Sequence, residues 1–388
     1  MKKSAAVILC VVLFLCGCGG KGKNKTTRIY ETGPYTTGVW MTYSEINSML
    51  KKGDFKSEFK KASVNLKSAK ITDLYFHVRP FCDSYYKSEL FPLNSLAEDL
   101  EYDLFEYVIS TCHNEGIRVH AWINPYRVKK NTQDINSLDK KSPAYIWLTD
   151  SDPENDRNVI ICDEGIFLNP ASAESRMLVI NGIREILNNY AVDGIHFDDY
   201  FYPSPEEKTD QNDYSEYCGK TSDPLTLSEW RRTNVNALIS GVYTAVKFVN
   251  KNITFSISPA ASIEKNYNDL YADIMQWIKC GCIDDIIPQL YFGFNYPDKN
   301  FRFEHLLEVW KDAVKGSNVR LIAGLANYKV GTDSPADKEE WENGTDIISR
   351  QVEICKNDSS LSGHIYFSYS YLFSDNELLK KSFENIKQ

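Results

Sequence analysis

Eight short apolar runs, each closing on polar or aromatic residues, are the feature that most constrains the fold of this chain. They span residues 37–43, 71–80, 117–127, 192–200, 253–260, 283–292, 319–328 and 363–370. Segments with helical spacing separate them, and regular alternation of strand and helix predicts a parallel sheet. An open, doubly wound sheet is the alternative, but no glycine-rich phosphate turn follows the first run. We therefore predict an α/β fold, a TIM (β/α)8 barrel closed by eight strands.

The connecting segments divide into helices and two long loops. Residues 96–116 carry an apolar stripe at helical spacing and end at Gly116, and residues 172–190 repeat the pattern after Ser172, a favoured N-cap residue. The connections after strands three and four, residues 128–168 and 201–228, show little helical periodicity. Both follow carboxyl ends of strands, where barrel enzymes build their sites. An inserted small domain is an alternative, although each stretch is too short to bury its own core.

The first twenty residues, "MKKSAAVILCVVLFLCGCGG", have a basic start, an apolar run and small residues around cysteine. This order is typical of a secretory signal, and Leu15-Cys16-Gly17-Cys18 resembles a bacterial lipobox in which Cys18 becomes lipidated. An uncleaved signal anchor is the alternative. We expect a signal peptide over 1–17, a flexible tether over 18–36 and a barrel domain over 37–388. Because no acidic residue follows Cys18, we expect a lipid-anchored protein of the cell envelope, at the outer membrane of a Gram-negative cell.

Charge and cysteine content exclude several classes of partner. The formal net charge is −9, which makes nucleic acid a poor partner. Seven cysteines lie beyond Cys18, an odd and scattered set that does not form a disulfide framework and leaves room for one or two bridges at most. Cys280-Gly-Cys282 has no matching Cys or His pair nearby, so we predict buried thiols there, with no metal and no cofactor. The sequence does not indicate an oligomeric state.

Two adjacent acids end the fourth run, in "VDGIHFDDYFYP" (192–203). Side chains alternate along a strand, so His196 and Asp198 share one face and Asp199 shares the other with Phe197. Polar residues two apart also occur in the second run, at His77 and Arg79, and in the third, at His120, Trp122 and Asn124; polar side chains on a wrapped strand are costly unless they face the interior. We therefore predict that Asp198 points inward as a catalytic group, while Asp199 either caps the following loop or turns inward if the strand has already ended.

Aromatic residues at the strand ends fit a sugar ligand, because a flat ring can cover the apolar face of a pyranose. Glycoside hydrolysis uses two carboxyl groups, and adjacent strand residues point apart, so we expect the second acid from another loop. Asp83 is the nearest by topology, with Glu164, Glu206 and Glu264 as weaker alternatives. Ligand binding is predicted for Arg79, Asn124, Tyr126, Arg127, His196, Asp199, Tyr200, Tyr202, Gln289, Tyr291, Asn327 and Tyr328.

Several uncommon strings occur in a fixed order along the chain. They are "TGVWMTY", "FHVRPFCDSYYKSELFP", "VHAWINPYR", "FLNPAS", "VDGIHFDDYFYP", "SISPAAS", "IIPQLYF" and "GLANYKVG". Together they resemble glycosyl hydrolase-like family 10 (DUF187) of bacterial lipoproteins and cell-wall-associated proteins. The resemblance implies a TIM-barrel glycoside hydrolase fold, and one branch of that family cleaves peptidoglycan glycan strands that lack stem peptides. The fifth strand departs from the clan pattern, because "SISPAAS" has no acid where many retaining relatives place a Glu.

We expect an exo-cytoplasmic glycoside hydrolase that acts on a cell-wall or other complex glycan, with Asp198 and Asp83 as its catalytic pair. Two alternatives remain open. A metal-dependent hydrolase or deacetylase would use His77, His120 and His196, which share the inward parity on consecutive strands. A carbohydrate-binding lipoprotein without turnover is compatible with the missing acid on strand five. Metal analysis distinguishes the first alternative, and product analysis of glycans distinguishes the second.

Overall fold

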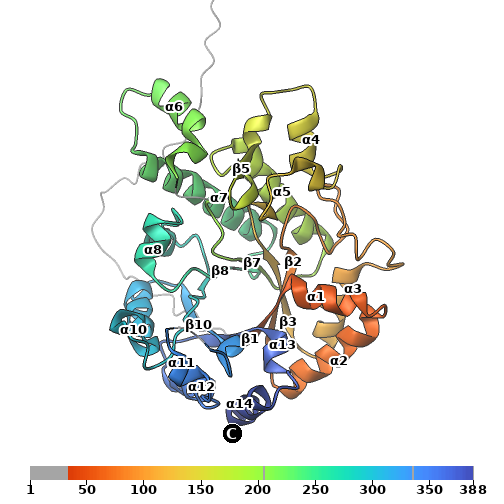
Figure 1. Cartoon of the computed structure of the whole chain (residues 1–388), viewed down its shortest axis with the longest axis vertical. Helices are drawn as coiled ribbons and strands as arrows, with labels where there is room; N and C mark the ends of the chain where they lie inside the picture. Colours follow the sequence, from red (N-terminus) through yellow and green to blue (C-terminus); the bar gives the residue numbers. More distant parts are fainter. Residues whose placement is uncertain (1–33, 204–205, 334–335, 388) are drawn as a thin grey trace, which may run out of the picture. The chain divides into compact units, whose positions relative to one another are not determined.

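The computed structural model describes residues 34–203, 206–333 and 336–387; the predicted signal peptide, most of the tether and Cys18 lie outside them. Eight parallel strands close into a barrel whose spatial order follows the chain (Figure 1). This confirms the predicted TIM barrel. The strands are β1 (Thr36–Met41), β2 (Asp73–Arg79), β3 (Arg118–Ile123), β7 (Gly194–Phe197), β8 (Thr254–Ile257), β9 (Asp285–Ile286), β10 (Arg320–Leu325) and β11 (Gly363–Phe367).

The barrel strands are shorter than the apolar runs that predict them, and β7 shows the reason. We predict a strand over 192–200, but β7 ends at Phe197. The last ladder bond on one side joins the backbone N–H of Ser258 to the carbonyl of Phe197, and the next free N–H, that of Asp199, donates instead to Oδ1 of Asp198 at 2.9 Å. A side chain that takes over a backbone donor ends the ladder. Both acids therefore lie beyond the strand.

Helices surround the barrel (Figure 1). They are α1 (Tyr43–Lys51), α2 (Phe55–Ser68), α3 (Leu104–Asn114), α5 (Ala173–Asn189), α7 (Leu227–Val249), α8 (Ile263–Asn268), α9 (Ile274–Cys280), α10 (Phe303–Val314), α11 (Lys338–Trp341), α12 (Ile347–Asn357), α13 (Tyr369–Leu372) and α14 (Glu377–Lys387). The Ser172 cap of α5 is confirmed, since its side chain accepts from the backbone N–H of Ser175. The helix predicted over 96–116 begins only at Leu104, because Asp103 caps it by accepting from Phe105 and Glu106.

The two long connections contain more regular structure than their sequence indicates. The first holds a three-stranded antiparallel sheet of β4 (Arg127–Lys130), β6 (Gly165–Leu168) and β5 (Val159–Cys162), together with α4 (Pro143–Thr149). The second holds α6 (Gln211–Gly219). Both insertions lie beyond carboxyl ends of barrel strands. The three strands of the first insertion are short and pair only with each other, so local periodicity in the sequence does not predict them.

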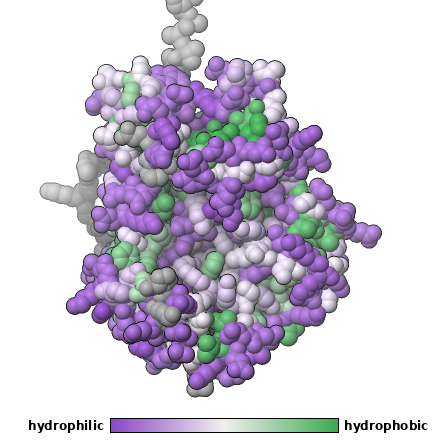
Figure 2. Space-filling model, in the orientation of Figure 1, coloured by the Kyte–Doolittle hydropathy of each residue, from purple (hydrophilic) through white to green (hydrophobic). Residues whose placement is uncertain are grey.

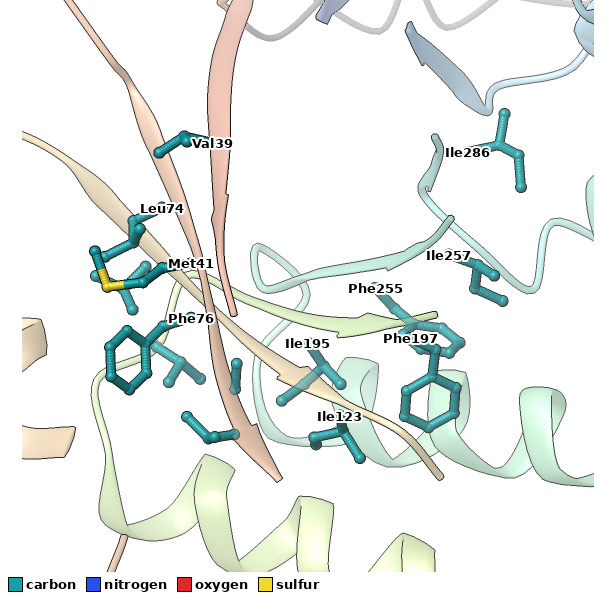
Figure 3. Close-up of a cluster of buried hydrophobic side chains, with 14 of the residues drawn as sticks. Val39, Met41, Leu74, Phe76, Ile123, Ile195, Phe197, Phe255, Ile257 and Ile286 are labelled. Carbon is teal, nitrogen blue, oxygen red and sulfur yellow. The ribbon is translucent and has the colours of Figure 1, made fainter. Parts of the chain in front are cut away.

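Burial divides each barrel strand into two faces. Figure 3 shows apolar side chains, among them Leu74, Phe76 and Ile195, that belong to the large core between the barrel and its helices. A second, smaller cluster fills the barrel interior and consists of Trp40, Tyr75, Trp122, Ile287, Ile322 and Ile365. The seven cysteines of the described residues are free thiols, and no helix among the described residues is long and apolar enough to cross a membrane.

A buried ion pair closes the amino-terminal end of the barrel. Asp73 accepts from Nη2 of Arg118 and contacts Nε2 of His120, each at 2.8 Å, and its side chain is fully buried. Burial alone would raise the pKa of Asp73, but the hydrogen bond and attraction of His120 and the charge of Arg118 lower it to about 2. His120 therefore faces the barrel interior as predicted, and its contact with Asp73 gives it a structural role.

We expect replacement of Asp73 by Asn to lower the free energy of unfolding at pH 7 by roughly 2–3 kcal/mol. This is the stabilisation that corresponds to a pKa about two units below its ordinary value. A depressed carboxyl pKa stabilises the fold above its unfolded value near 4, and this stabilisation disappears as the pH falls from about 4 to about 2. Urea denaturation at several pH values measures it. Asp312→Asn, an exposed acid on α10, is the matched control. Equal stability of the Asp73 variant and the control at pH 7 would contradict the expectation.

Candidate active site

An open cavity lies at the carboxyl end of the barrel, with a volume of about 310 Å³. All eight barrel strands or the residues directly after them contribute to its wall. The lining consists of Trp40, Thr42, Tyr43, His77, Trp122, Asn124, Arg127, Asp198, Tyr200, Ser258, Gln289, Tyr291, Tyr328 and Phe367. Half of these side chains are aromatic, whereas the surface seen in Figure 2 is largely hydrophilic. A cavity lined half by aromatic rings and half by polar side chains suits a ligand that has apolar faces and hydroxyl edges.

Asp198 and Asp199 form a carboxyl pair at this wall. Oδ1 of Asp198 accepts from the backbone N–H of Asp199 at 2.9 Å and from Nε2 of Gln289 at 3.1 Å. Each carboxyl group also affects the pKa of the other. The strand ends before both residues, which is the condition of our alternative for Asp199, and strand alternation no longer governs their directions. The partner acid of Asp198 is its own neighbour.

Burial is the largest influence on the pKa of both carboxyl groups. Burial, then the charge of Asp199 and its hydrogen bond, raise the pKa of Asp198 well above its ordinary value. Burial also raises the pKa of Asp199, but less, because Asp198, Gln289 and Arg127 favour its charged form. The pKa of Asp198 is therefore raised more strongly than that of Asp199. A carboxyl group kept protonated above its normal range can donate that proton in a reaction.

Arg127 supplies a cation to the same wall. Its guanidinium lies 3.6 Å from the ring centre of Tyr200, and its charge favours the ionised form of both aspartates. Arg127 begins β4, so the inserted sheet and not the barrel positions it. Tyr200 is 44% exposed and forms part of the cavity's open side.

Several buried polar atoms of the wall have no hydrogen-bond partner among the described residues. They include both ring nitrogens of His77, Nε1 of Trp122, Oδ1 of Asn124 and Nε of Arg127. The rings of His77 and Trp122 stack 3.6 Å apart, with an interplanar angle of 10°. Burying unsatisfied polar groups costs free energy, and a ligand with hydroxyl or amide groups would satisfy them. These atoms mark the polar part of the candidate site.

His196 lies beneath the cavity and does not line it. It is completely buried; its Nε2 accepts from Nε1 of Trp40 at 3.0 Å, and its Nδ1 bonds Oγ of Ser256 at 2.9 Å. Burial, and then the charge of His120, lower the pKa of His196 well below its ordinary value, so the ring is neutral. We predict substrate contact for His196, but the structure assigns it to holding the ring of Trp40.

Arg79 points away from the barrel interior, contrary to the prediction from parity with His77. The pairing of β2 with β3 shifts register between these two residues, a β-bulge that reverses the alternation. The guanidinium of Arg79 lies 4.3 Å from the ring centre of Phe91 and packs against Gly182 of α5, where an added Cβ would be 2.9 Å from its Nη1. Arg79 therefore occupies the layer between barrel and helices.

Asp83 is not brought to Asp198. It lines a different cavity, next to Lys129 and Leu138 of the first insertion, and its Oδ2 accepts from Nδ2 of Asn94 at 2.6 Å. The pKa of Asp83 is raised, and burial is the largest cause. The three weaker acid candidates are exposed and also lie outside the lining of the central cavity, namely Glu164, Glu206 and Glu264.

Three more predicted ligand-binding residues are structural in their placement. Tyr126 is fully buried in the outer core, and Asn327 is buried outside the cavity wall. The hydroxyl of Tyr202 donates to Oδ2 of Asp210 at 2.6 Å, and Asp210 forms a fully buried ion pair with Arg231. This cluster fixes the loop after β7 to α7.

The structure gathers half of the twelve predicted ligand-binding residues on the cavity wall: Asn124, Arg127, Tyr200, Gln289, Tyr291 and Tyr328. Asp199 joins them through its bond to Asp198. Sequence reasoning missed Trp40, Thr42, Tyr43, Ser258 and Phe367 as site residues. The available signal is their position, because all five stand at or just after the carboxyl end of β1, β8 or β11.

The metal alternative finds no support in these contacts. His120 and His196 each use a ring nitrogen in bonds to Asp73 and Ser256, and His77 stacks on Trp122. Within residues 34–203, 206–333 and 336–387 no group of three His, Cys, Asp or Glu side chains has the arrangement of a metal site.

Comparison with known proteins connects this site to one family. The family model described as glycosyl hydrolase-like 10 matches residues 36–343. The chain is 30% identical to glycosyl hydrolase DigH of Escherichia coli K12 over 332 residues, which cover 78% of this chain and 73% of that protein. It is also 30% identical to glycosyl hydrolase YngK of Bacillus subtilis over 341 residues, 81% of this chain and 63% of that one.

Solved structures share the fold at low sequence identity. The glycoside hydrolase domain of PgaB (BpsB) from Bordetella bronchiseptica aligns with a TM-score of 0.57 and 13% identity, over 90% of this chain and 98% of that one. The catalytic domain of β-amylase from Paenibacillus polymyxa aligns with a TM-score of 0.59 and 12% identity, over 90% and 97%. At this level of identity the likeness is one of barrel architecture.

Proposed function

The chain belongs to the glycosyl hydrolase-like 10 family, and on that premise we propose that it is a glycoside hydrolase that cleaves a bacterial cell-wall glycan outside the cytoplasm. The observation that carries the proposal is a buried pair of acids with raised pKa values, Asp198 in the wall of an aromatic cavity and Asp199 bonded to it through its backbone N–H. Cleavage of a glycosidic bond needs a proton for the leaving oxygen and negative charge near the positive anomeric carbon of the transition state. This pair of carboxyl groups supplies both.

In this mechanism the protonated carboxyl of Asp198 is the general acid. Burial keeps it protonated, and the hydrogen bonds from Gln289 and the backbone of Asp199 hold its Oδ1, which leaves Oδ2 to carry the proton. Asp199 keeps its negative charge, which stabilises the oxocarbenium-like transition state. The aromatic side chains of the wall bind the faces of the sugar rings, and the unsatisfied polar atoms bind their hydroxyl groups.

We propose glycan strands of peptidoglycan as the substrate, because the relatives carry the name glycosyl hydrolase and the wall has one cation beside the acid pair. Purified protein incubated with peptidoglycan strands, with and without stem peptides, should release muro-oligosaccharides that mass spectrometry detects. Strands without peptides should be the better substrate, because a cavity of about 310 Å³ accommodates sugar rings more readily than branched units. Unchanged strand lengths in both digests would contradict the proposal.

We also propose that a lipid on Cys18 holds the protein at the cell envelope. Replacement of Cys18 by Ala should remove the lipidated form and release the protein from the membrane fraction, because a single sequence position carries the attachment. Fractionation and the precursor size in the presence of globomycin measure this. Cys16→Ala is the matched control, since it changes a neighbouring cysteine of the same segment. Membrane association and globomycin sensitivity that persist in the Cys18 variant would contradict lipidation there.

A further inference from the structure

We propose that the substrate supplies its own nucleophile: the carbonyl oxygen of a 2-acetamido group attacks the anomeric carbon of the same sugar. The sugar in the cavity is then an N-acetylhexosamine, and hydrolysis retains the anomeric configuration. This inference rests on the proposed glycosidase function and adds the reaction path and the group that the substrate must carry.

The first support is the spacing of the two acids. A protein nucleophile and a general acid stand roughly 5–5.5 Å apart, and the acid and base of inverting enzymes roughly 6.5–9.5 Å apart, because the sugar or a water must fit between them. Asp198 and Asp199 are neighbours in the chain, and the backbone N–H of Asp199 donates to Oδ1 of Asp198 at 2.9 Å. Only Asp198 of the two lines the cavity, so the pair meets a bound sugar from one side and does not flank its anomeric carbon.

The second support is the composition of the cavity wall. Asp198 is the only acid in the lining formed by the described residues. At the end of β8 the wall residue is Ser258, and the surrounding string "SISPAAS" contains no acid. Asp83 lines a separate cavity. The described wall therefore offers one acid and its bonded neighbour, with no opposing carboxylate to act as nucleophile or base.

The third support is the floor of the cavity. An acetamido group that folds beneath its sugar needs an apolar surface for its methyl and a donor or acceptor for its amide. Trp40 and Phe367 lie 5.9 Å apart between ring centres, and Trp122 belongs to the same apolar cluster, which also contains three isoleucines. Nε1 of Trp122 is buried and has no partner among the described residues. Apolar rings and an unsatisfied donor thus meet in the floor.

The charges of the pair also fit this path. In the first step the acetamido oxygen bonds to the anomeric carbon, the bond to the leaving oxygen breaks, and that oxygen takes the proton of Asp198. Two adjacent carboxylates would then repel each other in buried surroundings. The positive oxazolinium ring that forms at the same time neutralises one charge, with its N–H donating to Asp199. In the second step water attacks the anomeric carbon, gives a proton back to Asp198, and reopens the ring to the acetamido group.

Thiazolines derived from N-acetylglucosamine and N-acetylmuramic acid mimic this bicyclic intermediate. Calorimetry should show that at least one of them binds wild-type protein at least 10²-fold more tightly than its parent sugar, the minimum gain expected of a transition-state analogue. Asp199→Asn should lose most of that gain, because Asn cannot offer the charge that the ring nitrogen needs, whereas Asp312→Asn should keep it. A thiazoline that binds no more tightly than its parent sugar overturns the inference.

Two measurements of turnover separate this inference from the proposed function. Proton NMR of the first product should show retention, and replacement of the N-acetyl by an N-trifluoroacetyl group should lower kcat/KM by about 10²-fold, because the fluorinated carbonyl is a weaker nucleophile. Cleavage with inversion, or cleavage that ignores fluorination, overturns the inference and leaves the glycosidase intact. If no glycan is cleaved, the proposed function fails, and the binding comparison still decides whether the site recognises the intermediate.

Discussion

Replacement of Asp198 by Asn should lower kcat on a cleavable glycan by about 10² or more, the usual contribution of a general acid. Asn has the size of Asp and keeps an oxygen to accept from the backbone of Asp199 and from Gln289, so the fold and the wall should persist. It has no transferable proton, so the loss should fall on kcat and leave glycan affinity largely unchanged, the pattern of a group used in the transition state.

Steady-state kinetics on peptide-free glycan strands measures kcat, and calorimetry with a non-cleaved oligosaccharide measures affinity. Asp312→Asn makes the same chemical change at an exposed position on α10 and should behave as wild type. Thermal unfolding of both variants verifies the fold. Turnover of the Asp198 variant close to wild type would remove this residue from the chemistry.

Replacement of Asp199 by Asn should move the basic limb of the kcat/KM profile to lower pH. The pKa of Asp198 is raised first by burial and then by the charge and hydrogen bond of Asp199. The substitution removes the second and third effects and keeps the first, so the pKa of Asp198 falls. Above that pKa the protonated fraction drops about tenfold for each unit of pH, so activity at neutral pH falls accordingly.

The profile from pH 4 to 9 measures this shift, and partial recovery of activity at acidic pH distinguishes it from unfolding. Because interacting carboxyl groups titrate as a pair, the wild-type limb belongs to Asp198 and Asp199 together, whereas the variant reports Asp198 alone. Asp312→Asn should leave the profile unchanged. A basic limb that stays in place, or moves to higher pH, would contradict the effect of Asp199 on the pKa of Asp198.

This prediction replaces the simpler expectation that Asp199 only shapes a loop and contributes to binding. That expectation follows from strand alternation, which requires a backbone that stays in the ladder. Here the N–H of Asp199 bonds the side chain of Asp198, and the chain bends out of the strand at that point. The catalytic interpretation changes accordingly, from one inward acid with a distant partner to two adjacent acids with raised pKa values.

The sequence determines the barrel and most of the strand-end polar groups. Eight apolar runs that alternate with helical segments predict one closed parallel sheet. The carboxyl ends of its strands meet on one face, so Asn124, Gln289 and Tyr291 reach the same cavity. The order of uncommon strings along the chain also identifies the family correctly. These conclusions depend only on the order of the segments and on the alternation of side chains along a strand, and both can be read from the sequence.

Only the tertiary structure decides where the alternation of side chains along a strand ends. A bulge in β2 turns Arg79 outward, the early end of β7 joins Asp199 to Asp198, and the packing of the first insertion places Asp83 in another cavity. Each outcome depends on a competition between backbone ladder bonds and side-chain bonds or packing from distant segments, with differences of only about 1 kcal/mol per hydrogen bond. Such small balances are set by neighbours that folding brings together, and local sequence does not contain them.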